Sequence, residues 1–280
     1  ILRPIERDRL YDEGAWLSDV RQQVAEHVDA ARSGREANVA IVGYHKDASS
    51  YYLSLFPEWE YVSTPYYQNI NSTDIRNVYF ALDPEDTVLA QPAIANCVPA
   101  PTRDSLERFR QDERYRHLCE EFVYVRSYRQ SWSVAPYPPI LVVVNALVLH
   151  SECLLVIRRR HQPGRGTLAL PGGFLEPEET LQAATVRELR EETHINVPAA
   201  HLQQAIAAQH VFDRPQRSLR GRAIAHVTVF QLATDSLPQV EGGDDASQAW
   251  WLPLQELSAF EDRFFADHYQ IIRYALACLR

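Results

Sequence analysis

Three glutamates lie close enough along one segment to bind a divalent cation together. Glu188, Glu191 and Glu192 fall within residues 178–193, a stretch of strong helix formers with apolar residues available to pack. On a helix, Glu188 lies three residues from Glu191 and four from Glu192, so the three carboxylates share one edge. Like charges at this spacing cost about a few tenths of a kcal/mol per pair. A hard cation such as Mg²⁺ or Mn²⁺ reverses that sign, because it binds carboxylate oxygens, water and phosphate. A solvated acidic helix face is the ordinary alternative.

A glycine-rich loop precedes these glutamates at a fixed spacing. Gly173 is followed after five residues by Glu179, and after seven more by the sequence RELREE, which begins at Arg187. This segment resembles the Nudix box and departs from it at His194, where the family has glycine. The resemblance implies a Nudix pyrophosphohydrolase that uses Mg²⁺ or Mn²⁺. We expect His194 in the left-handed conformation that glycine adopts at such helix ends, at a cost on the order of 1 kcal/mol.

The resemblance also assigns roles within the box. It implies metal ligands from the carbonyl of Gly173 and the carboxylates of Glu188, Glu191 and Glu192. Glu188 and Glu192 are the catalytic candidates, because a metal ion there lowers the pKa of the attacking water. Glu179 and Arg187 are expected to form a structural ion pair that ties the loop to the helix.

Stretches after the box bear on the substrate. Residues 211–222 hold four arginines, and arginine binds phosphate in a bidentate manner; a solvent-facing basic loop is an equally good interpretation. With residues 242–246 and 250–254, this stretch resembles the ADP-ribose pyrophosphatases of the Nudix family. Many family members place a general base after the box, which suggests Glu241, with Asp244 and Asp245 as alternatives. The predicted substrate-binding residues are Arg158, Arg165, Arg217, Arg220 and Arg222.

Two motifs near the start of the chain resemble nicotinamide mononucleotide (NMN) adenylyltransferases. Residues 41–52 resemble that family's middle motif, and residues 70–76 resemble its phosphate motif, where a Ser/Thr pair at a helix N-terminus binds ATP. A plain helix N-cap is the alternative role of Ser72 and Thr73. The likeness is closest to bifunctional proteins that fuse this enzyme to a Nudix ADP-ribose pyrophosphatase. The nucleotide-binding candidates are Gly43, Lys46, Asp47, Ser72, Thr73 and Arg76.

One motif of the adenylyltransferases has no counterpart in this sequence. Their glycine-rich loop with paired histidines should precede residue 1, and the first histidine here is His27, inside a predicted helix. The chain also contains no methionine, not even at position 1. We therefore expect a longer natural protein, a first domain without its first strand, and no NMN adenylation by these 280 residues alone.

A proline-rich connector at residues 135–139 divides the expected elements, since three prolines exclude helix there. We expect helical stretches at 14–31, 47–56 and 104–132, strands at 38–43, 140–144 and 223–232, and a hairpin at 147–158. The predicted fold class is α/β plus α+β. An incomplete Rossmann-like nucleotidyltransferase domain over 1–135, ending in a long helical segment, precedes a Nudix α/β/α sandwich domain over 136–280.

The composition restricts the classes of partner. The chain is 46% hydrophobic and 23% charged, as in soluble globular proteins, and it has no apolar run long enough for a membrane span. The net charge of −9 disfavours a broad nucleic-acid surface. Four scattered cysteines indicate free thiols in a reducing cytoplasm. We expect a cytoplasmic protein without nucleic-acid or membrane partners. Nudix pyrophosphatases of this type often form homodimers, but the sequence does not distinguish a dimer from a monomer.

The predicted reaction is Mg²⁺-dependent hydrolysis of ADP-ribose to AMP and ribose 5-phosphate. One alternative is a Nudix hydrolase for another nucleoside diphosphate derivative, such as NADH or an oxidised deoxynucleoside triphosphate. Another is a non-catalytic Nudix regulator that senses ADP-ribose. Such regulators often lose box carboxylates, whereas all three are present here.

Overall fold

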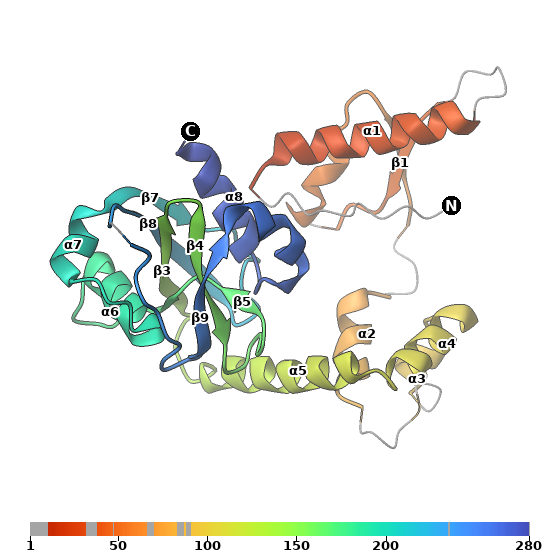
Figure 1. Cartoon of the computed structure of the whole chain (residues 1–280). Coiled ribbons are helices and arrows are strands. Elements are labelled where there is room, and N and C mark those ends of the chain that lie inside the picture. Colours follow the sequence, from red (N-terminus) through yellow and green to blue (C-terminus); the bar gives the residue numbers. More distant parts are fainter. Residues whose placement is uncertain are drawn as a thin grey trace. The chain divides into compact units, whose positions relative to one another are not determined.

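The computed structural model describes residues 11–31, 38–46, 48–65, 70–82, 87, 91–234 and 236–279. The chain divides into two compact units, Ile1–Tyr115 and Arg116–Arg280. The division falls within helix α5 (Glu113–Ser131), so this helix belongs partly to each unit (Figure 1). The domain boundary expected at residue 135 stays a prediction. Within the described ranges, no helix combines the length and apolar character that crossing a membrane requires.

The first unit contains a short parallel sheet and several helices. Strand β1 pairs in parallel with β2, with Ala40 opposite Glu60. Parallel strands need a crossover between them, and a helical turn lies in that connection. This turn is a 3-10 helix, shorter than the helical stretch expected at 47–56. The elements are α1 (Glu13–Ala31), β1 (Ala40–Gly43), η1 (Ala48–Ser54), β2 (Glu60–Ser63), α2 (Ser72–Tyr79), α3 (Pro92–Ala95) and α4 (Ala100–Phe109).

The long helix expected over 104–132 is wrong, because α4 ends at Phe109 and α5 begins at Glu113. Asp112 lies in the break, where its carboxylate accepts a hydrogen bond of 2.9 Å from the backbone N–H of Arg114. This contact satisfies a donor at the start of α5 that would otherwise lack a partner. The apolar pattern has its six-residue gap, from Phe109 to Tyr115, at the same place.

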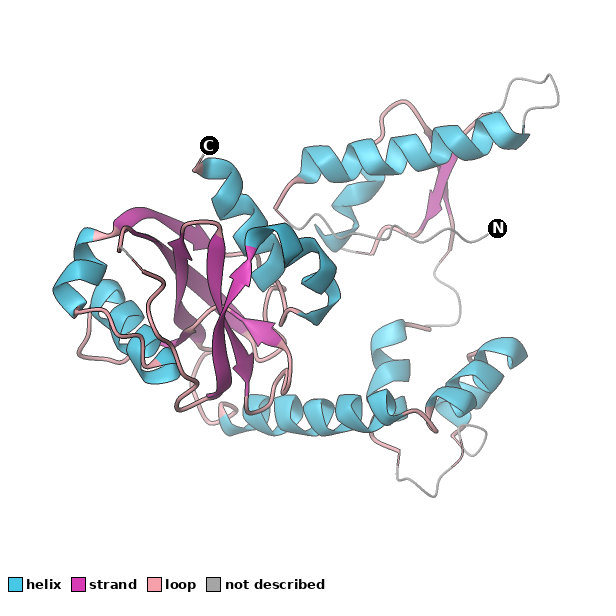
Figure 2. Ribbon diagram, in the orientation of Figure 1, coloured by secondary structure: helices cyan, strands magenta, loops and turns pink. Residues whose placement is uncertain are grey.

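The second unit is built on a mixed sheet in its described residues. The strands follow the order β5-β4-β3-β8-β7, with β6 paired to β3 and β9 paired to β4. Figure 2 shows helices on both sides of this sheet, which confirms the predicted α/β/α sandwich. The elements are β3 (Ile140–His150), β4 (Cys153–Arg159), β5 (Leu168–Ala169), β6 (Gly172–Phe174), α6 (Leu181–Thr193), α7 (Ala199–Gln204), β7 (Ile206–Phe212), β8 (Arg222–Leu232), β9 (Ala246–Pro253), η3 (Leu254–Arg263) and α8 (His268–Cys278).

Strand β3 is the central strand of this sheet. It pairs in parallel with β8 along its whole length, from Ile140 opposite Arg222 to His150 opposite Leu232. The predicted strand at 140–144 and the first arm of the predicted hairpin therefore form one continuous strand. Its residues from 143 to 150 are all buried, as expected for a strand covered on both faces.

Helix α6 carries the three glutamates. It begins after Thr180, whose hydroxyl accepts a hydrogen bond of 3.2 Å from the N–H of Ala183. Its apolar face, including Val186 and Leu189, packs into the main core of this unit. The helix ends at His194 with φ 43° and ψ 30°, which confirms the left-handed conformation predicted there.

Candidate active site

Strand β6 brings the glycine-rich loop against the acidic edge of α6. The strand pairs with β3, which places Gly173 opposite Val144. The N–H of Gly172 donates a hydrogen bond of 2.7 Å to Oε2 of Glu192. A Cβ atom on Gly173 would overlap the carboxylate of Glu188. Glycine at position 173 therefore lets the loop lie in direct contact with this carboxylate, which an added side chain would displace.

The three box glutamates differ in exposure. The Glu188 side chain is 12% exposed and that of Glu191 is 47% exposed, whereas Glu192 is only 2% exposed. Burial raises the pKa of Glu192 to about 8, and the neighbouring charges of Glu188 and Asp245 raise it further. Burial also raises the pKa of Glu188, and the charges of Glu191 and Asp244 add to this effect. These acids form one partly buried negative cluster, which a cation would stabilise.

Arg187 connects the glycine-rich loop to this cluster. Its guanidinium donates to both oxygens of Glu179, at 2.6 and 3.0 Å, so the expected ion pair is present in the structure. The same group contacts Glu188 at 2.9 Å and Glu191 at 3.0 Å. The hydrogen bonds that its guanidinium donates to three acids, led by Glu179, raise the pKa of Arg187, and burial opposes this shift.

Arg187 binds two of the carboxylates that are predicted to hold a metal ion, so it would compete with that ion for them. Among the residues that the structure describes, no three His, Cys, Asp or Glu side chains are arranged as a complete set of metal ligands. Two of the predicted ligands, Glu188 and Glu191, instead share Arg187. Binding of a cation there would require Arg187 to release these oxygens, and Glu179 could still hold its guanidinium.

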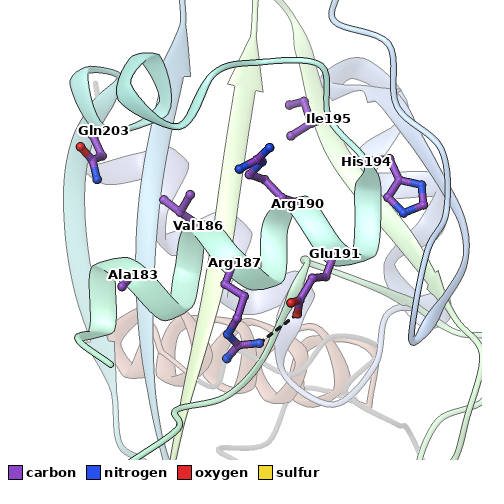
Figure 3. Close-up of a pocket in the computed structure, with 8 residues that line it drawn as sticks. All are labelled: Ala183, Val186, Arg187, Arg190, Glu191, His194, Ile195 and Gln203. Atoms are coloured by element: carbon purple, nitrogen blue, oxygen red, sulfur yellow. Dashed lines mark hydrogen bonds and ion pairs between the residues drawn. The ribbon is translucent and has the colours of Figure 1, made fainter. Parts of the chain in front are cut away.

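A pocket of about 700 Å³ lies along the outer side of α6. Figure 3 shows Arg187 and Glu191 joined by their ion pair at its edge. Glu191 therefore faces both this open space and the acidic cluster, which agrees with its greater exposure. The pocket is lined by Ala183, Val186, Arg187, Arg190, Glu191, His194, Ile195 and Gln203.

The loop between β8 and β9 packs on the C-terminal end of α6. The N–H of Glu241 donates to the carbonyl of Thr193 at 2.8 Å, and the N–H of Gly243 donates to the carbonyl of Glu192 at 3.0 Å. Of the three candidate bases on this loop, Asp244 and Asp245 are close enough to shift the pKa of Glu188 and Glu192 respectively. Glu241 is exposed and is not among the groups that shift either pKa.

Most of the predicted substrate arginines bind protein groups in the structure. Arg217 donates to both oxygens of Asp267, at 2.9 and 3.0 Å, and the two side chains are 5% and 1% exposed. Arg165 pairs with Glu120 at 2.9 Å. The others bind neutral groups: Arg158 the side chain of Gln248 and the carbonyl of Gly166, and Arg222 the carbonyl of Asp213.

Two residues at the start of α8 bind the arginine-rich loop and the segment before the glycine-rich loop. Asp267 binds Arg217 of the arginine-rich loop, and the neighbouring His268 accepts a hydrogen bond of 3.0 Å at Nδ1 from the N–H of Leu170. Burial lowers the pKa of His268 to about 3, so its imidazole is neutral and remains an acceptor. Leu170 directly precedes the glycine-rich loop, which is thereby fixed at its beginning.

Arg220 differs from the other predicted arginines, and Arg159 joins it. The guanidinium of Arg220 lies 4.7 Å from the ring centre of Phe174 in β6, and burial lowers its pKa. Arg159 was not among the predicted site residues. Burial lowers the pKa of Arg159, and the nearby charge of Arg220 lowers it further. Regular strand alternation could not have identified it, because the pairing of β4 with β9 shifts in register between Arg158 and Arg159.

The candidate residues for nucleotide binding in the first unit lie near β1 and α2. Gly43 ends β1, where an added Cβ atom would approach Leu53 to 2.9 Å. The N–H of Lys46 donates to the hydroxyl of Ser50 at 3.0 Å. Asp47 lies outside the described residues.

Helix α2 begins with Ser72 and Thr73, but neither caps it. The N-cap is Asn71, whose side-chain oxygen accepts a hydrogen bond of 2.9 Å from the N–H of Asp74. The alternative interpretation of Ser72 and Thr73 as N-caps is therefore wrong. Arg76 reaches the hydroxyl of Thr73 at 3.5 Å, so the predicted phosphate-binding side chains lie together at this helix end.

Comparisons with known proteins agree with this architecture. Residues 139–275 match the NUDIX domain family. The chain is 32% identical over 132 residues to the ADP-ribose pyrophosphatase of Methanocaldococcus jannaschii, which covers 47% of this chain and 70% of that protein. It is 28% identical over 114 residues to the nicotinamide/nicotinic acid mononucleotide adenylyltransferase of Acinetobacter baylyi, covering 40% of this chain and 53% of that protein.

A solved structure matches across both units. It is a bifunctional NMN adenylyltransferase/ADP ribose pyrophosphatase from Francisella tularensis, complexed with AMP and a manganese ion. The identity is 36%, the TM-score is 0.85, and the match covers 96% of this chain and 76% of that chain. The chain is thus an enzyme of the bifunctional NMN adenylyltransferase/ADP-ribose pyrophosphatase family, and its C-terminal part is a Nudix hydrolase domain.

Proposed function

We propose that the second unit hydrolyses ADP-ribose to AMP and ribose 5-phosphate, with Mg²⁺ or Mn²⁺ held by Glu188, Glu191, Glu192 and the carbonyl of Gly173. The observation that carries the proposal is the partly buried acidic cluster in direct contact with the glycine-rich loop, where a Cβ atom at position 173 would displace the carboxylate of Glu188. The relatives support the substrate: a similar protein is named ADP-ribose pyrophosphatase, and a similar structure holds AMP and manganese.

The residues of this site have different proposed roles in the reaction. A divalent ion supplies charge to offset that of the diphosphate and to acidify the attacking water. Glu192 keeps its orientation through the N–H of Gly172, and the neighbouring Glu188 is held against Gly173. Arg187 could stay paired with Glu179 if Glu188 and Glu191 were to bind the cation. The proton of the water passes to a loop carboxylate, for which Glu241, Asp244 and Asp245 are the candidates.

A product assay tests this function. The purified chain is incubated with ADP-ribose and Mg²⁺, and the products are separated by chromatography; we expect AMP and ribose 5-phosphate in equal amounts. Glu188→Gln should lower kcat/KM by at least about 100-fold, because it removes the negative charge of a proposed metal ligand at the reacting centre. Glu178→Gln is the matched control, because Glu178 is an exposed carboxylate on the same segment.

The same assay separates the alternatives. Hydrolysis of NADH or an oxidised deoxynucleoside triphosphate, without hydrolysis of ADP-ribose, would contradict the proposed substrate. Binding of ADP-ribose with no hydrolysis of any compound would indicate a sensor instead. Single substitution of each loop acid identifies the base, because loss of the base lowers kcat more than it raises KM.

We also propose NMN adenylylation for a longer protein that joins this chain to the histidine motif of the adenylyltransferases. The support is the match to the bifunctional structure across both units and the parallel β1–β2 pair followed by α2 with its polar N-terminus. Incubation with NMN and ATP should yield NAD and pyrophosphate with the longer protein. NAD formation by these 280 residues alone would show that the missing histidine motif is dispensable.

A further inference from the structure

Arg220 is held by aromatic rings and has no acidic partner in the described part of the chain. Its guanidinium lies 4.7 Å from the ring centre of Phe174 and 5.8 Å from that of Tyr128 on α5. Its Nε is buried and has no hydrogen-bond partner among the described residues. Rings contact the flat faces of a guanidinium, so the N–H groups at its edge remain for a ligand.

The backbone that leads into Arg220 is held by two contacts. Arg217, three residues earlier, is bound by the buried carboxylate of Asp267. Arg129 of α5 donates a hydrogen bond of 2.8 Å to the carbonyl of Leu219. An arginine whose loop and faces are both held loses little conformational freedom when it binds a ligand.

Arg159 is a second buried guanidinium nearby. Its Nε donates to the carbonyl of Pro163 at 2.9 Å, and its guanidinium lies 4.4 Å from the ring centre of Phe265. No ion pair of Arg159 with a carboxylate is found within the described ranges. Its charge interacts both with Arg220 and with Glu192, so Arg159 lies near Arg220 and near the acidic cluster.

We propose that Arg159 and Arg220 form a subsite for a phosphate group of the substrate diphosphate, and that Tyr128 of α5 positions Arg220. Two buried positive charges without acidic partners are costly in the free protein, and an anion bound between them offsets that cost. Guanidinium groups bind phosphate oxygens through two parallel N–H donors. The subsite adjoins Glu192, so one phosphate can contact the arginines while the scissile bridge faces the metal ligands. This inference rests on the proposed diphosphate hydrolysis.

Binding of methylenediphosphonate tests the subsite without turnover. This compound carries the diphosphate alone and cannot be hydrolysed at its bridge, so the result does not depend on whether ADP-ribose is the substrate. In calorimetry with Mg²⁺, we expect Arg159→Gln and Arg220→Gln each to raise Kd by about 10-fold or more, because each loses charged hydrogen bonds. Arg273→Gln, an exposed arginine on α8, should leave Kd within about twofold.

Arg220→Lys guards against loss of folding. It keeps the charge but not the planar donor pair, so we expect a native melting temperature with weakened diphosphonate binding. Binding by Arg159→Gln and Arg220→Lys within twofold of the unaltered chain would overturn the subsite. So would the absence of diphosphonate binding to the unaltered chain.

The role of Tyr128 has its own readout. Tyr128→Ala should raise KM for the hydrolysed nucleotide about 10-fold with little change in kcat, because it frees Arg220 without touching the reacting centre. Tyr128→Phe keeps the ring and should restore the KM. Equal KM values for Tyr128→Ala and the unaltered chain, or a failure of Tyr128→Phe to restore KM, would refute positioning by this ring.

Discussion

Replacement of Glu192 by glutamine should stabilise the metal-free protein while it abolishes activity. Glu192 is 2% exposed, and burial raises its pKa from 4.5 to about 8. The folded protein therefore binds this proton more tightly than the unfolded chain does. The corresponding stability is complete below pH 4.5 and is lost as the pH rises toward 8.

The size of the effect follows from that shift. At about 1.4 kcal/mol per pKa unit, ionised Glu192 costs about 3 kcal/mol at pH 7 and at most about 5 kcal/mol at high pH. Water entry reduces such values, so we expect a gain of about 1–3 kcal/mol for Glu192→Gln at pH 8 and almost none near pH 5. The amide oxygen can still accept the N–H of Gly172, so the loop contact is preserved.

Urea unfolding in EDTA at pH 5.5 and pH 8 measures this difference. Glu178→Gln is the control and should change stability by less than about 0.5 kcal/mol at either pH. Mg²⁺ should then raise the stability of the unaltered chain but not that of Glu192→Gln, since the cation binds the ionised carboxylate. If the two proteins lost stability equally between pH 5.5 and 8, burial of an ionisable Glu192 in the cluster would be the wrong explanation.

Four further substitutions, two of them combined in one chain, test the residues that support the site. Arg187→Gln should lower both kcat/KM and the melting temperature, and Glu179→Gln in the same chain should add little, because the two residues act as a pair; a full additive loss would contradict this. Arg217→Met should destabilise the protein by about 3–5 kcal/mol in urea unfolding, since it removes the ion pair between Arg217 and the buried carboxylate of Asp267; a loss under 1 kcal/mol would argue against a buried charge. Gly243→Ala should cost about 1–3 kcal/mol, because the added methyl overlaps the carbonyl of Glu191, and a native melting temperature would show that the loop can move away.

The parts of the site that the sequence predicted well are those set by local spacing. The glutamates, the helix that carries them and the left-handed His194 all follow from distances of one or two helical turns. These features need no knowledge of what surrounds the segment. The contact of Gly173 with Glu188 was not predicted, because the sequence indicated only a metal-binding role for the Gly173 carbonyl.

The parts that the sequence did not predict depend on contacts between distant segments. Arg217 was expected to meet the substrate, but its partner Asp267 lies 50 residues away and nothing in the loop indicates the pair. Composition could not separate Arg217 from Arg220, although one binds a carboxylate and the other binds rings. The break between α4 and α5 was missed although the apolar pattern has its six-residue gap there, because the three- and four-residue steps on both sides favoured one helix.

In the free protein, this site holds two groups of like charges that lack full compensation: the acidic cluster and the two arginines Arg159 and Arg220. The acids of the cluster lie close to one another. Arg187 pairs with two of them, Glu188 and Glu191, and also with Glu179. Arg159 and Arg220 are buried near these acids, yet neither forms an ion pair with a carboxylate within the described residues. A cation on the acids and a diphosphate on the arginines would each remove a repulsion and would attract each other across the scissile bond. Metal and substrate should therefore bind cooperatively, and each alone should bind more weakly than in the presence of the other.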